Sequence, residues 1–477
     1  MPPILFATEF AVSRSLPLEA QVANNLFVER QGQGAKSQSP LFGVPGTNQF
    51  ATTSTAPNRS GGAYNYLGLA YFVQGNALWT VSSSGVATQV GTGILGAGPV
   101  SMADNGVQLM IVNGTQGYVY TTGGGLVLVT DPAWLPADTV EFMDGYFIFN
   151  RHATNEYFLS QLYDGTTYNA LDFASAEAQS GYCLKCVQNL ELLFVFTTSH
   201  IEIWYDAGTN DFPFQRYAGG VIPYGAASPY AIIKQDGAIF FLGTDKVVYR
   251  LQANVPIRVS THPIETAIDQ DANLSVATMM TYTIQGHKMV VLTLPTSQQT
   301  LVFDVSTGKW HKRESWNDVE PGPVHPVTYN RWRATSAVEI YQQVLLGDMV
   351  DGRIGNLNWS GYMEYGNNIR GLARSVPQHA DRKWLFCYQF ELDIEAGVGN
   401  AVDPGSNPQL MLRYSRDGGR TWSLYQPYRT MGAIGAYQTR LRWQKMGRAL
   451  QWVWEILITD PVKRTIIAAH AEILPGM

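Results

Sequence analysis

The sequence is poor in charge and in long apolar runs. Only 15% of its 477 residues are charged, and the formal net charge is −6. A protein that reads DNA directly usually carries a basic face, so this balance argues against that class. No run approaches the ~18 apolar residues of a membrane-spanning helix, and the first residues lack the basic and apolar regions of a signal peptide. We therefore expect neither a membrane span nor export by a signal.

Cysteine is scarce as well, because the chain has only Cys183, Cys186 and Cys387. An odd number of cysteines cannot form a disulfide framework, which fits folding in a reducing cytosol. Cys183 and Cys186 have the spacing of a redox or zinc motif, but a second pair and a nearby pair of histidines are missing. Their apolar neighbours favour buried strand cysteines over a site. We expect no metal and no cofactor.

Glycine and aromatic residues are plentiful: the chain has 46 Gly, 25 Tyr, 20 Phe and 12 Trp, and 45% of it is apolar. Aromatic residues interrupted by glycine favour strands and tight turns over helices. A unit of short apolar strands joined by Gly, Asp or Asn turns recurs along the chain, as in residues 140–149 and 233–249. The predicted class is all-β.

The spacing of these units favours a β-propeller. From one turn to the next the distances are 31, 39, 44, 48 and 49 residues, which lie near the ~40 to 50 of propeller blades. A β-helix has a much shorter period, and a sandwich has fewer strands. The sequence thus predicts six or seven blades. The turns used are Gly75, Gly106, Gly145, Asn189, Gly237 and Gly286.

Composition divides the chain into three parts. Residues 1–60 contain polar Gln, Gly and Ser stretches and are predicted to form an N-terminal arm and ring-closing segment. Residues 61–365 hold the repeated units and are predicted to be the propeller. Residues 366–477 contain alternating or continuous apolar strands and are predicted to form a small β-sandwich.

A complete Asp-box pattern lies in the C-terminal part. In this pattern the Ser and Asp side chains hold a hairpin turn by hydrogen bonds to the backbone. Asp boxes occur in sialidases and other sugar-active propellers, but away from the reacting groups, and here a single copy lies outside the propeller. We interpret it as a structural turn rather than as a glycosidase signature. Its residues are Ser415, Asp417, Gly419, Thr421 and Trp422.

Catalytic groupings are missing from the sequence. A glycosidase needs two carboxylates beside the sugar, or a tyrosine nucleophile with an arginine cluster. The candidate acids Asp144, Asp236, Asp245 and Asp304 each stand in a turn, where Asp is expected for its backbone properties. The eight histidines show no metal-ligand spacing, and nucleophile elbows and phosphate-binding loops are missing too. We expect that the protein is not an enzyme.

Basic residues concentrate near the C-terminus. Between Asp403 and Arg464 ten basic residues face four acidic ones, a local charge of +6, so the rest of the chain carries −12. Such a face can be merely solvated, or it can dock against an acidic neighbour and fix orientation in an assembly. The candidate assembly contacts are Arg440, Arg442, Lys445 and Arg448.

Several segments resemble one known family. Residues 439–448 and 454–462 resemble a sequence motif that recurs in tail hub or nozzle proteins of short-tailed bacteriophages, the packaged-DNA stabilisation family. Three upstream segments follow in the order and spacing of that family, so the resemblance covers most of the chain. They are residues 42–46, 100–103 with 112–114, and 199–204.

The resemblance implies a structural component of the virion tail, made in the host cytoplasm. Members of the family form a homohexameric ring below the portal and its adaptor, continue or seal the DNA channel, and anchor fibres, spikes or a needle. DNA would pass without sequence recognition. Two alternatives stay open: a glycan-binding or glycan-cleaving propeller, and a generic propeller scaffold for interactions.

Overall fold

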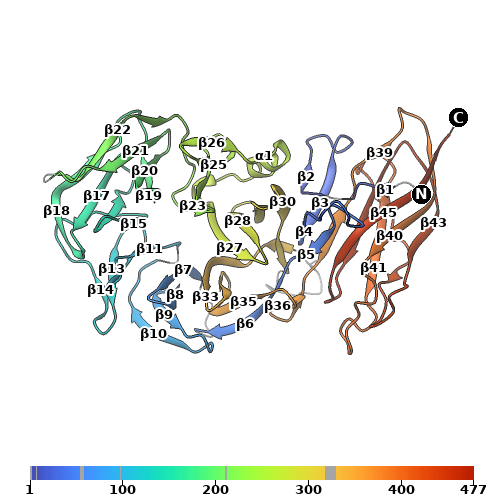
Figure 1. The fold of residues 1–477 in the computed structure, drawn as a ribbon, viewed down its shortest axis with the longest axis horizontal. Helices are drawn as coiled ribbons and strands as arrows, with labels where there is room; N and C mark the ends of the chain where they lie inside the picture. Colours follow the sequence, from blue (N-terminus) through green and yellow to red (C-terminus); the bar gives the residue numbers. More distant parts are fainter. Residues whose placement is uncertain are drawn as a thin grey trace.

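The computed structural model describes residues 3–6, 8–53, 59–96, 98–209, 212–316 and 329–476. Among the described residues, seven four-stranded antiparallel blades follow one another around a ring, and a β-sandwich lies beside the ring (Figure 1). Five of the blades are separate sheets, whereas the strands of the other two belong to larger sheets. The predicted all-β class, with a propeller and a C-terminal sandwich, is therefore confirmed. Within the described ranges, no helix is long and apolar enough to cross a membrane.

Blades 1 to 5 are consecutive in sequence, each an up-and-down meander with its first strand innermost. Blade 1 comprises β7 (Ser60–Tyr66), β8 (Leu69–Gln74), β9 (Ala77–Val81) and β10 (Ala87–Thr92). Blade 2 comprises β11 (Ser101–Asp104), β12 (Gln108–Val112), β13 (Gly117–Thr121) and β14 (Gly125–Leu128). Blade 3 comprises β15 (Val140–Met143), β16 (Tyr146–Asn150), β17 (Glu156–Gln161) and β18 (Asp164–Ser175). Blade 4 comprises β19 (Cys183–Asn189), β20 (Leu192–Thr197), β21 (Ile201–Asp206) and β22 (Phe214–Ile222). Blade 5 comprises β23 (Ile232–Gln235), β24 (Ala238–Leu242), β25 (Val248–Gln252) and β26 (Val255–Arg258).

The last two blades complete the ring with help from the N-terminus. After α1 (His262–Asp269) and a 3-10 helix, η1 (Leu274–Val276), blade 6 comprises β27 (Thr278–Ile284), β28 (His287–Leu294), β29 (Gln299–Asp304) and β30 (Lys309–Lys312). Blade 7 comprises β33 (Ala334–Ile340), β34 (Gln343–Asp348), β35 (Arg353–Asn358) and, as its outer strand, β6 (Gly46–Thr52). Because the last blade takes a strand from near the start of the chain, the ring is closed non-covalently.

The blade spacing in the sequence was irregular for a structural reason. Gly75 lies in the turn between β8 and β9, whereas Gly106 and Gly145 lie in the turn between the first and second strands of their blades. The equivalent turn of blade 1 holds Gly68, 38 residues before Gly106. Gly68 has a φ of +76°, which glycine adopts without strain. With this correction the short first interval disappears.

The sandwich consists of two sheets that both include N-terminal strands. One sheet has the order β4 (Leu26–Val28), β5 (Leu41–Gly43), β45 (Thr465–Pro475), β40 (Leu385–Ile394) and β43 (Leu441–Ala449), and β1 (Pro3–Ile4) also pairs with β45. The other has the order β3 (Ala20–Asn24), β38 (Gly371–Arg374), β44 (Gln451–Ile458), β41 (Gln409–Ser415) and β42 (Arg429–Thr430), with β2 (Ala11–Val12) on β3 and β39 (Gln378–His379) on β44. Short hairpins β31 (Glu314–Trp316) with β32 (Tyr329–Arg331), and β36 (Met363–Glu364) with β37 (Asn367–Asn368), lie near the junction.

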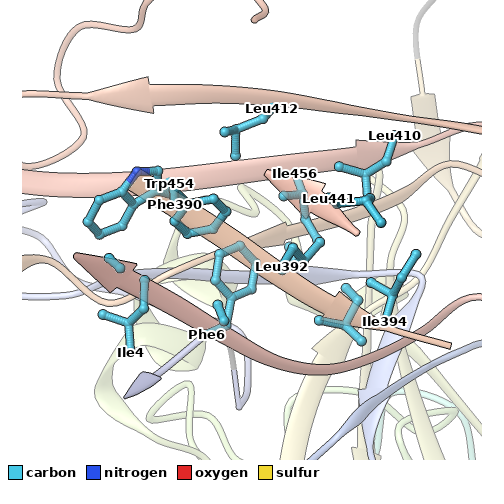
Figure 2. Packing of buried hydrophobic residues seen from close by; sticks show 14 of the residues in the cluster. Ile4, Phe6, Phe390, Leu392, Ile394, Leu410, Leu412, Leu441, Trp454 and Ile456 are labelled. Atoms are coloured by element: carbon cyan, nitrogen blue, oxygen red, sulfur yellow. The ribbon is translucent and has the colours of Figure 1, made fainter. Parts of the chain in front are cut away.

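One apolar core fills the space between the two sandwich sheets (Figure 2). Trp454 of β44 stacks on Phe390 of β40 with ring centroids 5.3 Å apart, and Leu412 and Ile456 extend the same layer. Phe6 from the N-terminal segment packs against Phe390 at 6.4 Å. Of the N-terminal segment, predicted as an arm and ring-closing segment, β1 to β5 pair within the sandwich sheets, β3 also pairs with blade 6, and β6 is a strand of blade 7. The predicted boundaries at residues 60 and 365 stay predictions.

Strand β3 joins the two parts of the molecule. It pairs in parallel with β30 of blade 6 at Asn24 and Lys312, and antiparallel with β38 of the sandwich. The next residue, Asn25, accepts a hydrogen bond from the backbone N–H of Glu314 and donates to the carbonyl oxygens of Glu314 and Arg370. Hydrogen bonds that continue from blade to sandwich hold the two parts in a fixed relation.

Candidate assembly surface

The Asp-box residues form a tight turn directly after β41. The Asp417 carboxylate accepts hydrogen bonds from the backbone N–H of Arg420 and Thr421 at 3.0 and 2.9 Å, and Ser415 accepts one from Gly419 N–H at 2.8 Å. Burial alone would raise the pKa of Asp417, but the hydrogen bonds from Ser415, Thr421 and Arg420 lower it to about 2. The carboxylate is therefore engaged by its own turn and is not available as a reacting acid.

Trp422 lies at the end of this turn beneath two arginines. The guanidinium carbons of Arg374 and Arg413 lie 4.8 and 4.9 Å from its ring centroid. Both arginines also pair with Glu455, whose side chain is completely buried in β44, at 2.6 and 2.5 Å. The turn is thus anchored to a buried ionic cluster.

Two of the four predicted assembly contacts are paired within the chain. Arg440 and Arg442 both bind the carboxylate of Glu391 on β40, at 2.8 and 3.1 Å. Glu391 lies outside the segment whose charges were counted in the sequence, so this pairing was missed. These two arginines contribute less free positive charge to the surface than the sequence suggested.

The other two predicted contacts lie further along β43. Lys445 is exposed at an irregular step of the strand, where its φ is +59°. Arg448 is exposed and lies 4.7 Å above the ring of Trp384, whose side chain is itself 45% exposed. Arg448 and Trp384 belong to a larger feature that the sequence did not reveal.

That feature is an open groove of about 1030 Å³ at one end of the sandwich. Its arginines come from three separate segments of the chain, which is why sequence reasoning did not assemble it; the basic excess near the C-terminus was the only signal. Arg416 reaches across from the Asp-box turn and donates a hydrogen bond to the carbonyl oxygen of Met446 at 2.7 Å, which ties the turn to β43. The lining residues that carry charge or an aromatic ring are His379, Asp381, Arg382, Trp384, Arg416, Asp417, Arg420 and Arg448.

The centre of the propeller holds a second cavity, of about 430 Å³. Among its described lining residues the single carboxylate is Glu141, which pairs with Lys234 at 3.2 Å. Lys185 donates to the carbonyl oxygen of Ile232, and burial lowers the pKa of its ammonium group to about 8. Glycoside hydrolysis by a carboxylate pair needs a second acid. This arrangement does not favour the glycan-cleaving alternative.

The cysteines are free and buried. Cys183 and Cys186 both lie on β19 in the core between blades 3 and 4. Burial, with Cys183 as a hydrogen-bonding neighbour, raises the pKa of the Cys186 thiol well above its ordinary value. Thiols of this kind are poor nucleophiles and poor metal ligands. No group of three or more metal-ligating side chains occurs in the part of the chain that the structure describes.

Fold and surface together define a β-propeller protein that carries a C-terminal β-sandwich with an arginine-rich groove. A family model described as "Bacteriophage P22 Gp10, beta-propeller" matches residues 14–361, and one described as "Bacteriophage P22 Gp10, beta-sandwich" matches residues 377–474. The chain belongs to this family of tail-associated structural proteins of short-tailed phages, and it is a virion component. The resemblance noted in the sequence is confirmed.

Comparisons with other proteins add little. No curated protein was found to match this sequence. The extracellular domain of a putative hybrid two-component system, BT4673 from B. thetaiotaomicron, is 11% identical, with a TM-score of 0.45 over 92% of this chain and 59% of that one. An exo-beta-1,3-galactanase from Phanerochaete chrysosporium is 10% identical, with a TM-score of 0.30 over 80% of this chain and 97% of that one. Likenesses this weak have no bearing on function.

Proposed function

We propose that this protein is the hub or nozzle of a short phage tail. In this role it forms a homohexameric ring below the portal and adaptor, continues or seals the DNA channel, and anchors fibres, spikes or a needle. The observation that carries the proposal is the family match, which covers both parts of the molecule. A fixed junction between propeller and sandwich supports it, because a ring that bears load needs subunits of constant shape.

The charge of the chain suits a conduit for DNA. Outside the segment from Asp403 to Arg464 the formal charge is −12. Like charge weakens the attachment of DNA phosphates to the walls and so favours rapid passage. We expect the lumen of the assembled tail to carry few lysines or arginines near the DNA. Basic side chains in contact with phosphates along the channel would contradict this part of the proposal.

The proposed role is structural and includes no catalysis. The Asp-box carboxylate is engaged by its turn, and the acid that lines the propeller centre is paired with Lys234. We expect no cleavage of host polysaccharide by the purified protein. Release of sugars at a rate that Glu141→Gln abolishes would favour the glycan-cleaving alternative instead.

Imaging tests the proposed role directly. Purified protein, alone and mixed with tail components, is examined by negative-stain electron microscopy. We expect sixfold rings, formed either by the protein alone or upon addition of the adaptor. Particles that stay monomeric in both settings and never join a tail would refute the proposal.

A further inference from the structure

The ends of the molecule carry opposite charges. Blades 3 and 4 lie at one end of the long axis, and the sandwich lies at the other (Figure 1). Three carboxylates lie near one another at the blade end: Asp144 in the turn between β15 and β16, Glu191 in the turn between β19 and β20, and Asp206 at the end of β21. We call these three the acidic patch. In the ranges that the structure describes, none of them forms an ion pair.

The carboxylates of the acidic patch influence one another. Partial burial, and then the nearby charges of Asp206 and Glu191, raise the pKa of Asp144. Burial, followed by the charges of Asp206 and Asp172, likewise raises the pKa of the neighbouring Tyr146. A cluster of negative charges without a cation is a cost to the free subunit, and a positive partner would relieve it.

Apolar side chains surround the acidic patch. Leu190 precedes Glu191 and is 74% exposed, and Tyr205 precedes Asp206 and is also exposed. Leu162 and Tyr163 lie against Gly145 in the adjoining turn, and Tyr163 is 63% exposed. Exposed tyrosine and leucine side chains that gather beside polar residues are typical of a protein interface rather than of a solvated surface.

The groove of the sandwich offers the complementary set. Arg382, Arg420 and Arg448 have no ion pair with any described residue, and all three are exposed. Trp384 and Leu450, 45% and 42% exposed, add apolar surface to the same groove. The acids that line it are Asp381, which is exposed, and Asp417, whose oxygens are taken by the Asp-box turn. The groove therefore keeps an excess of free positive charge beside an aromatic ring.

We propose that the groove receives the acidic patch of a second copy of this chain, so that copies associate head to tail. The inference rests on the proposed ring and assigns its contact surfaces. Two different surfaces at opposite ends of a rigid subunit make a heterologous contact, which closes into a ring when the rotation per subunit allows it. The fixed junction at β3 and Asn25 keeps that rotation constant from subunit to subunit.

Exchange of charges tests the contact. One variant reverses the groove with Arg420→Glu and Arg448→Glu. A second changes the acidic patch with Glu191→Lys and Asp144→Asn, where Asn is chosen because it tolerates the positive φ of that position. A third full-length chain carries all four substitutions, so that the new cation at position 191 faces the new carboxylates at positions 420 and 448 of the neighbouring copy.

Matched controls change charge elsewhere. Arg14→Glu with Arg30→Glu reverses two exposed arginines outside the groove, and Glu339→Lys reverses an exposed acid of blade 7. Melting curves of all variants establish that they fold. Self-association is measured by analytical ultracentrifugation, and rings are imaged both with purified chains and in tails from cells in which the variant replaces the wild type.

We expect either half-reversal to weaken self-association by about 100-fold and the combined variant to recover to within about 10-fold of wild type. The controls should stay within about 3-fold. The inference would be overturned if both half-reversed variants still formed the same rings as the wild type, or if the combined variant did not recover self-association. Either result would leave the proposed hub function standing. If variant tails kept their rings but lacked another tail protein, the groove would be the binding site of that protein, and the inference would be overturned as well. A wild type without rings in either setting would refute the hub itself.

Discussion

The propeller and the sandwich hold their cores in different ways. In the propeller each apolar cluster joins neighbouring blades, as where Met110 of blade 2 meets Phe149 of blade 3. Among its described residues, the sandwich has one cluster, which includes both sheets and the N-terminal Ile4 and Phe6. Loss of a buried side chain between two blades should therefore loosen only those blades. Loss of one from the sandwich core should loosen every strand that packs on this core, including the N-terminal strands.

The two regions also use charge differently. The sandwich buries Glu455 between two arginines and leaves other arginines free along its groove. Blades 3 and 4 leave carboxylates unpaired at the surface. Paired charge stabilises the sandwich from within, and unpaired charge at both ends is available for recognition. Four substitutions test this comparison, from the largest expected effect to the smallest.

Trp454→Ala should be the most destabilising change. Removal of a buried Trp from a single core costs about 4 kcal/mol of unfolding free energy. Hydrogen exchange should rise throughout the sandwich and in β3. Phe149→Ala is the matched change in the propeller, and its effect on exchange should stay within blades 2 and 3. If both substitutions raised hydrogen exchange over equally large parts of the chain, the two cores would not differ as described.

Glu455→Ala should cost about 3 kcal/mol, because it leaves two arginines near the core without their shared carboxylate. Urea unfolding measures this loss. Glu395→Ala removes an exposed partner of Lys463, an ion pair of 2.8 Å, and serves as the control, with an expected cost below ~1 kcal/mol. Similar costs for the two variants would contradict the internal role assigned to Glu455.

Asn25→Gly should loosen the junction without adding backbone strain, since glycine accepts the φ of +53° at this position. The backbone groups of Glu314 and Arg370 lose their side-chain partner, at a cost of about 2 kcal/mol. We expect faster exchange of the β3 amides and easier proteolysis between blade 6 and the sandwich. An unchanged exchange pattern would mean that Asn25 does not hold the junction.

Asp417→Ala should have the smallest effect, about 1 kcal/mol, through loss of the turn hydrogen bonds. The pKa of Asp417 is lowered from 3.8 to about 2 in the folded state, so its stabilisation is complete above about pH 5 and is lost progressively as the pH falls through 3.8 toward and below 2. Wild type and variant should therefore converge in stability over that range. A difference that stays undiminished down to pH 2 would contradict the assigned hydrogen bonds.

Local patterns in the sequence predicted the blades well. The segment 140–149 contains β15 and β16 with their Asp144–Gly145 turn, because strand alternation and turn chemistry are encoded within a few residues. The pairing of β1 to β5 with the sandwich could not be predicted in this way. Those contacts join residues hundreds of positions apart, such as Pro3 and His470, and no local pattern records them.

The candidate surface was predictable only in part. The basic excess pointed to the sandwich, and Arg448 does line the groove. Arg382 lay outside the counted segment, and Glu391, which pairs with Arg440 and Arg442, did as well. Which charges cancel and which stay free depends on strand pairing across the sheet, which the sequence alone does not show.

Cryo-electron microscopy of the assembled tail would test head-to-tail assembly most directly. We predict a ring in which the groove with Arg420 and Arg448 contacts blades 3 and 4 of the neighbouring subunit around Asp144 and Glu191. A ring built from propeller-to-propeller contacts, with the sandwich groove facing solvent or another tail protein, would contradict this arrangement.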